Sequence, residues 1–168
     1  YLVGIETPIT MAPLPKYPNV LYLGYLDVVL YHEPSNTFKI IDIKTSTNGW
    51  KDKMKKDEDK QFQLVLYKKF FAEQFGVPKE NIDIEFLIVR RKIYTGGDFP
   101  QKRIQEFKPP SGKIKMNRAT KSLNDFIEEC FTSEGFTEDE MSPNPSKWNC
   151  TFCPYKDKKE LCNVGINS

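Results

Sequence analysis

Two apolar segments that follow one another in the chain, 20–32 and 37–44, each carry acidic residues among apolar neighbours. Both are rich in Leu, Tyr, Val or Ile, as β-strands are. The residues between them, Pro34-Ser35-Asn36, favour a turn. The sequence therefore predicts an antiparallel hairpin with acids on both of its strands.

Side chains alternate between the two faces of a strand, so Asp42 and Lys44 should share one face while Ile41 and Ile43 share the other. Asp27 lies inside the preceding strand, where a carboxylate is costly unless it is paired or bound to a metal. Two acids and a lysine on adjacent strands suit a divalent cation and an activated water. The alternative is a surface ion pair between these acids and Lys44.

The rest of the chain predicts a mixed α/β sheet in one domain of 168 residues, with no apolar run long enough to span a membrane and no signal peptide. Because the chain opens at Tyr1 directly in strand-like sequence, we expect a longer polypeptide with a further N-terminal element. The other expected elements are a strand over 1–10 that ends near Pro8, a helix over 59–75, a strand over 82–93, an edge strand over 101–108, a helix over 114–131 and an irregular tail from Pro143.

Several enzyme classes lack their residues here. The single histidine, His32, precedes the predicted turn and reads as a surface residue, and no serine has the context of a hydrolase nucleophile. Gly112-Lys113 lacks the earlier glycine and the following Ser or Thr of a P-loop. A serine-hydrolase triad and an ATPase motor are therefore excluded for this segment.

Charge is unevenly distributed along the chain. Segment 90–121 holds ten basic and two acidic residues, a net +8, whereas 125–140 holds seven acidic and no basic residues. The basic segment could face a polyphosphate, or it could be an ordinary solvated surface. The acidic segment is better read as a solvated helix face and loop. The basic residues that would bind such a polyphosphate are Arg90, Arg91, Lys102, Arg103, Lys113, Lys115 and Arg118.

Three elements in order, Gly24-x-x-Asp27, then Asp42-Ile43-Lys44-Thr45, then Gln63-Leu-Val-Leu-Tyr67, resemble the PD-(D/E)XK nuclease superfamily in its RecB-like branch. The resemblance covers roughly residues 1–92 and implies an α/β fold with a restriction-endonuclease-like mixed β-sheet flanked by helices. It also implies a first helix that this sequence does not contain.

The resemblance further implies site roles. Asp27 and Asp42 would hold Mg²⁺ or Mn²⁺ with the backbone carbonyl of Ile43, and Lys44 would orient or deprotonate the attacking water or stabilise charge. Gln63 and Tyr67, four residues apart, share a helix face toward the site; the alternative is that Tyr67 simply packs in the core. Gln61 is out of this register. Glu6 would be the family's upstream metal-binding acid, or else a surface glutamate at a strand end.

The tail motif Cys150-Thr-Phe-Cys153 with Cys162 resembles the cysteine group of iron–sulfur members of this branch, in which an upstream cysteine completes a [4Fe–4S] cluster. The gap from Cys153 to Cys162 is longer than the family's usual spacing. Cys130 is a candidate fourth ligand or a buried helix thiol. A Zn²⁺ site and cysteines without metal remain open alternatives.

We therefore expect a nuclease core over 1–142 and a cysteine-containing tail over 143–168 that packs on it. The predicted function is Mg²⁺-dependent hydrolysis of DNA phosphodiester bonds, by an exonuclease or by a nuclease of a recombination or phage replication system. The expected setting is the cytoplasm of a bacterial or phage-infected cell, with a helicase as a potential partner and no membrane. The alternatives are a non-catalytic nucleic-acid-binding module with the same fold and an unrelated interaction domain held by a metal at its cysteines.

Overall fold

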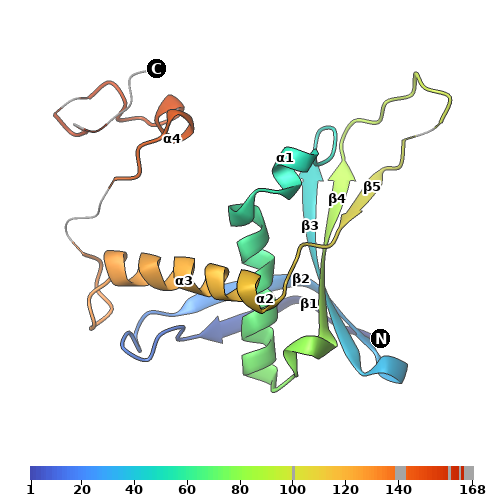
Figure 1. The fold of residues 1–168 in the computed structure, drawn as a ribbon, viewed down its shortest axis with the longest axis horizontal. Helices are drawn as coiled ribbons and strands as arrows, with labels where there is room; N and C mark the ends of the chain where they lie inside the picture. The colour runs from blue at the N-terminus through green and yellow to red at the C-terminus, as the bar shows by residue number, and fades with distance from the viewer. Residues whose placement is uncertain (100, 139–142, 159, 163, 165–168) are drawn as a thin grey trace.

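A five-stranded mixed sheet forms the centre of the computed structural model, which describes residues 1–99, 101–138, 143–158, 160–162 and 164 (Figure 1). The strands are β1 (Leu2–Met11), β2 (Tyr22–His32), β3 (Thr37–Ser46), β4 (Ile82–Arg90) and β5 (Ile104–Phe107). They lie side by side in chain order. Only β3 and β4 are parallel, because the helical connection between them returns the chain to the starting edge.

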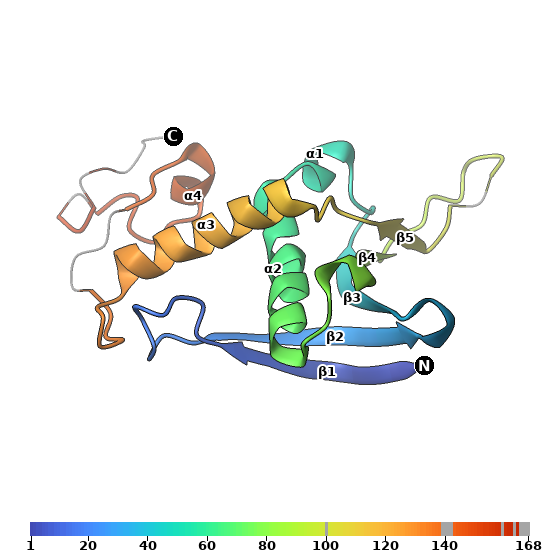
Figure 2. The ribbon, with the colours of Figure 1, turned by 60° about the horizontal axis from the view of Figure 1, so that its bottom comes forward.

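Helix α2 (Glu58–Phe75) covers one face of this sheet, and α3 (Lys113–Cys130) packs on α2 (Figure 2). The other helices are α1 (Asp52–Lys55) and α4 (Lys147–Thr151), with short 3-10 turns at Glu33–Ser35 and Lys79–Asn81. Figure 2 shows α2 standing on the sheet and α3 crossing α2. Helix α2 ends at Gly76, whose φ of 66° is left-handed and whose N–H bonds the carbonyl of Ala72.

The hydrophobic core fills the space between α2 and the sheet. Alternate residues of β4, such as Ile84 and Phe86, point toward Leu64 and Phe70 of α2, and all four are at least 97% buried. Burial of side chains of this size stabilises the fold by about 1.5–3 kcal/mol each. A second cluster of Tyr17, Val20 and Ile127 fastens the β1–β2 loop to α3. The helix that carries the candidate site is therefore fixed to the strands beneath it.

The predicted mixed α/β sheet flanked by helices and its hairpin are confirmed. The strand predicted to end near Pro8 instead continues to Met11, because β1 is an edge strand and tolerates a proline without a donor. The strand expected over 82–93 ends at Arg90, and the edge strand covers only Ile104–Phe107. The tail, expected to be irregular, contains α4.

No helix in the described part of the chain has the length and the apolar character needed to cross a bilayer. The predicted domain boundary at residue 142 lies outside the described residues. The packing of the tail on the core stays a prediction.

Candidate active site

Strand β3 carries the central pair of the candidate site. The Nζ of Lys44 lies 2.9 Å from Oδ2 of Asp42 and donates to its Oδ1 at 3.2 Å, which confirms that the two side chains share a face. Ile43 points to the other face and is 45% exposed. Asp42 is only 2% exposed, and its Oδ2 accepts no hydrogen bond of good geometry within the described chain. The Lys44 ammonium is the cation paired with this oxygen in the described structure.

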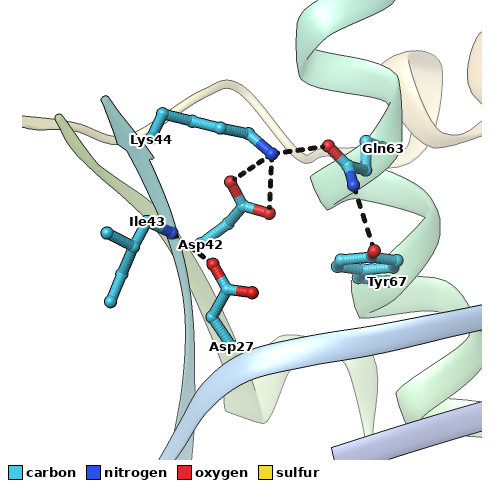
Figure 3. A network of polar contacts seen from close by, with 6 residues as sticks. All are labelled: Asp27, Asp42, Ile43, Lys44, Gln63 and Tyr67. Atoms are coloured by element: carbon cyan, nitrogen blue, oxygen red, sulfur yellow. Dashed lines mark hydrogen bonds and ion pairs between the residues drawn. The ribbon is translucent and has the colours of Figure 1, made fainter. Parts of the chain in front are cut away.

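A second carboxylate lies next to this pair. Oδ2 of Asp27 on β2 accepts a hydrogen bond of 2.6 Å from the backbone N–H of Ile43, so the strand that carries Asp42 also positions Asp27. Burial raises the pKa of Asp42 above its ordinary value, the Lys44 ammonium partly offsets the rise, and the charge of Asp27 adds to it. Figure 3 shows both carboxylates facing the space between β3 and α2.

Helix α2 completes the network from the opposite side. Oε1 of Gln63 accepts from Nζ of Lys44 at 3.1 Å, and Nε2 of Gln63 donates to the hydroxyl of Tyr67 at 3.0 Å (Figure 3). The spacing of four residues places both side chains on one helix face. Gln61 is buried instead beside α1, where its amide donates to the carbonyl of Lys55. Gln63, which the spacing to Tyr67 favoured over Gln61, is therefore the glutamine that contacts Lys44.

Gly24 leaves room for Tyr67. A Cβ at this position would lie 2.7 Å from a ring carbon of Tyr67, closer than such atoms approach. Tyr22 packs edge-on against Tyr67 with ring centroids 6.5 Å apart. Burial, and secondarily Tyr67, raises the pKa of the Tyr22 hydroxyl. The sequence analysis did not single out Tyr22, although it is an aromatic residue two positions from Gly24 and hence on the same strand face.

Glu6 lies opposite Asp27 in the β1–β2 pair, since Ile5 pairs with Val28 and Thr7 with Leu26. Its backbone is left-handed, with φ of 51°, a conformation that costs a non-glycine residue about 1–3 kcal/mol and occurs often at functional sites. No contact joins the Glu6 side chain to Asp27 or Asp42 in the described structure. Its role as a metal ligand stays a prediction.

The chemistry of the two carboxylates fits a hard divalent cation. Asp27 and Asp42 supply anionic oxygens, and the single Lys44 ammonium, paired with Asp42, leaves an excess of negative charge. Across the described residues, no three or more His, Cys, Asp or Glu side chains gather into a metal-binding group. The carbonyl of Ile43 is the predicted backbone ligand.

Several of the candidate DNA-binding residues have structural partners. Arg90 donates to the carbonyl of Lys102 at 2.7 Å, and Arg103 donates to the carbonyl of Arg90 at 2.9 Å, so this pair braces the β4–β5 connection. Arg91 bonds the hydroxyl of Thr47 at 2.9 Å.

On α3, Lys115 and Arg118 both bind Glu58, at 2.7 and 3.2 Å, which ties α3 to the start of α2. Lys113 stands in the first turn of α3, beside a cavity of about 460 Å³ that Lys68 and Ser111 also line. The role of the seven basic residues in binding DNA stays a prediction.

The cysteines are not gathered in the described arrangement. Cys150 and Cys153 lie one turn apart at the end of α4, where the N–H of Cys153 donates to the carbonyl of Cys150 at 3.2 Å. Cys162 follows in the tail, and Cys130 is buried at the end of α3. No three of the described cysteines gather into a metal-binding group, so the described geometry does not assemble a cluster or a zinc site.

Comparison with known proteins identifies the family of this chain. The family model of the PD-(D/E)XK nuclease superfamily matches residues 3–158. A comparison with curated proteins gave no match. Among solved structures, a protein described as SSO0001 aligns with a TM-score of 0.46 and 15% identity, over 98% of this chain and 61% of that one, so the chain spans less than two thirds of its length. The family model, which matches residues 3–158 and so nearly the whole chain, shows that this protein belongs to the PD-(D/E)XK nuclease superfamily.

Proposed function

We propose that this protein is a metal-dependent nuclease that hydrolyses phosphodiester bonds of DNA at the site formed by Asp27, Asp42 and Lys44. The observation that carries the proposal is the position of the Lys44 ammonium, held between buried Asp42 and Gln63 with a second carboxylate beside them. A phosphodiester repels anionic nucleophiles, so its hydrolysis needs concentrated positive charge next to an ordered water.

Asp27 and Asp42 would hold Mg²⁺ or Mn²⁺, with the carbonyl of Ile43 and the Glu6 carboxylate as further proposed ligands. When bound, the cation would neutralise phosphate charge and lower the pKa of a bound water. Lys44 is placed to orient that water or to donate to the developing phosphorane charge.

Gln63 and Tyr67 act as positioning residues. The Gln63 carbonyl accepts from the Lys44 ammonium, and the Tyr67 hydroxyl accepts from the Gln63 amide, so the helix fixes the direction of the lysine. Since Tyr67 is 94% buried and leans on Gly24, it has little freedom to release the amide.

The direct test is degradation of labelled DNA with Mg²⁺ or Mn²⁺ by the wild type, Asp42→Ala and Lys44→Ala. We expect losses of about 10³-fold and 10²-fold or more, because one variant loses a metal ligand and the other a charge-stabilising donor. Lys121→Ala is the control, since this lysine forms only an exposed ion pair with Asp125 one helical turn away. Equal cleavage by all four proteins would remove the assignment.

Two finer points belong to the same proposal. We place the enzyme among exonucleases or nucleases of recombination and replication, which predicts degradation of linear DNA and resistance of closed circles. The non-catalytic alternative predicts salt-sensitive DNA binding with no cleavage in any metal.

A further inference from the structure

A cleft of about 830 Å³ lies between the start of α2 and the C-terminal segment. One wall consists of α1 and the first turn of α2, and the opposite wall is Trp148 of α4. In both ribbon views α4 lies toward the end of the molecule that holds α1 and the start of α2 (Figures 1 and 2). The lining residues are Lys53, Met54, Lys56, Asp57, Lys60 and Trp148.

The helical wall of the cleft carries excess positive charge. Lys60 forms an ion pair with Asp57, whereas Lys53 and Lys56 form none with any described residue. Two ammonium groups without a counter-charge beside an open cleft favour an anionic occupant.

Trp148 gives the opposite wall a different character. Its side chain is 76% exposed and meets the ring of Phe152, itself 73% exposed, at 5.4 Å and 72°. The Ser146 hydroxyl caps α4 by accepting from the N–H of Asn149 at 3.0 Å, which fixes the turn that presents Trp148. An exposed indole facing lysines is the combination that binds single strands, with bases stacked on the ring and phosphates on the amines.

Helix α2 links the cleft to the candidate active site, because Lys60 lines the cleft and Gln63 belongs to the site. Lys60, Gln63 and Tyr67 are spaced by three and four residues, so they follow one helix face. Gln63 contacts the Lys44 ammonium directly. A strand that leaves the cleft at Lys60 therefore needs to advance about one helical turn, roughly 5 Å along the helix axis, to reach Gln63, the partner of Lys44.

We infer that this cleft binds a single DNA strand, with a base stacked on Trp148 and the backbone against Lys53 and Lys56, and that it leads the strand to Asp42 and Lys44. The last step depends on the proposed function, whereas the binding does not. Duplex DNA fits less well, because its bases already stack on one another and cannot lie on the indole without being unstacked.

The test measures binding of the whole chain in EDTA, by anisotropy, to labelled oligo-dT, to an abasic strand of the same length and to a duplex. We expect the wild type to bind oligo-dT about tenfold more tightly than the abasic strand, the factor of one stacked base. Trp148→Ala should remove this preference, and Trp148→Phe should keep most of it. Phe99→Ala, which alters an exposed aromatic residue outside the cleft, should leave it unchanged.

The lysines have a separate readout. The double variant Lys53→Gln, Lys56→Gln should weaken binding of oligo-dT and abasic strands alike and lower the salt dependence of log K by about 1.4, the value for two lost phosphate contacts to a single strand. Thermal unfolding of each variant is measured to check that the variant remains folded.

Unchanged binding of oligo-dT by Trp148→Ala would overturn the inference, as would stronger binding of the duplex or displacement of oligo-dT by polyglutamate at lower concentration. If Trp148→Ala loses the preference but the wild type cleaves no DNA in any metal, the cleft stands and the proposed function fails. If the wild type cleaves DNA and Trp148→Ala binds normally, the function stands and the cleft fails.

Discussion

Asp42 on β3 and Glu85 on β4 are equally buried, at 2% exposure each, but they have opposite surroundings. They lie on opposite faces of the sheet, since Glu85 pairs with Ile41 and Asp42 with Phe86. Oε2 of Glu85 has two lysines near it, with the Nζ atoms of Lys39 and Lys108 at 2.7 and 3.9 Å. Asp42 instead has a single lysine, Lys44, and a second acid, Asp27, near it.

The difference shows that burial of a carboxylate does not by itself indicate a site. Glu85 is surrounded by excess positive charge and needs no further cation, so its role is to join β4 to its neighbours. Around Asp42 negative charge is in excess, and burial raises its pKa because the ionised form is poorly compensated. A divalent cation would relieve that imbalance.

The largest expected effect is on catalysis. Asp42→Asn should lower kcat/KM for DNA cleavage by about 10³-fold or more, since the amide cannot replace an anionic metal ligand. Glu85→Gln, which is equally conservative and equally buried, should stay within about threefold of the wild type because it acts only on the fold. A comparable loss in both variants would show that the two carboxylates do not differ in function.

A smaller effect is expected on stability, with opposite signs in the two variants. Glu85→Gln should lower the free energy of unfolding by about 1–2 kcal/mol, because it removes one partner of a buried ion pair whose lysine remains partly solvated. Asp42→Asn should raise Tm in EDTA, because it removes a buried charge that the fold compensates poorly. Urea and thermal unfolding measure both changes, and a stabilised Glu85→Gln would contradict the comparison.

The smallest expected effect is the pH dependence of the gain in Tm of Asp42→Asn. A carboxyl whose folded pKa is raised adds stability below its unfolded pKa of about 3.9, and this contribution is lost as pH rises through the folded pKa. The Tm of Asp42→Asn relative to wild type should therefore increase from about pH 4 upward and level off once Asp42 is ionised. A Tm difference that is flat over this range would show that Asp42 carries no raised pKa.

Much of the fold could be predicted from local pattern. The alternation in 37–44 placed Asp42 and Lys44 on one face, and the turn residues between two β-rich segments gave the hairpin. The helical period placed Gln63 and Tyr67 together. These features depend on neighbours within about one turn or one strand pair, where sequence spacing fixes geometry.

Other parts depend on contacts between distant segments and escaped prediction. The bond from Ile43 to Asp27 depends on the register of β2 against β3, and the space at Gly24 depends on where α2 crosses the sheet. The basic segment shows the same limit: Arg90 and Arg103 carry charge in the sequence, but in the structure their side chains donate to the backbone carbonyls of Lys102 and Arg90. A count of charges cannot show which of them are already paired.

The sequence by itself determined which residues are candidates for the site, the faces that they occupy on their own strand or helix, and the family to which the chain belongs. Only the tertiary structure decided that the Lys44 ammonium lies between Asp42 and Gln63, and that Glu85 has two lysines near it whereas Asp42 has one. It also decided that Trp148 lines the same cleft as Lys53 and Lys56. The physical reason is range: backbone periodicity fixes direction over a few residues, whereas compensation of charge depends on every group within a few ångströms, wherever it lies in the chain.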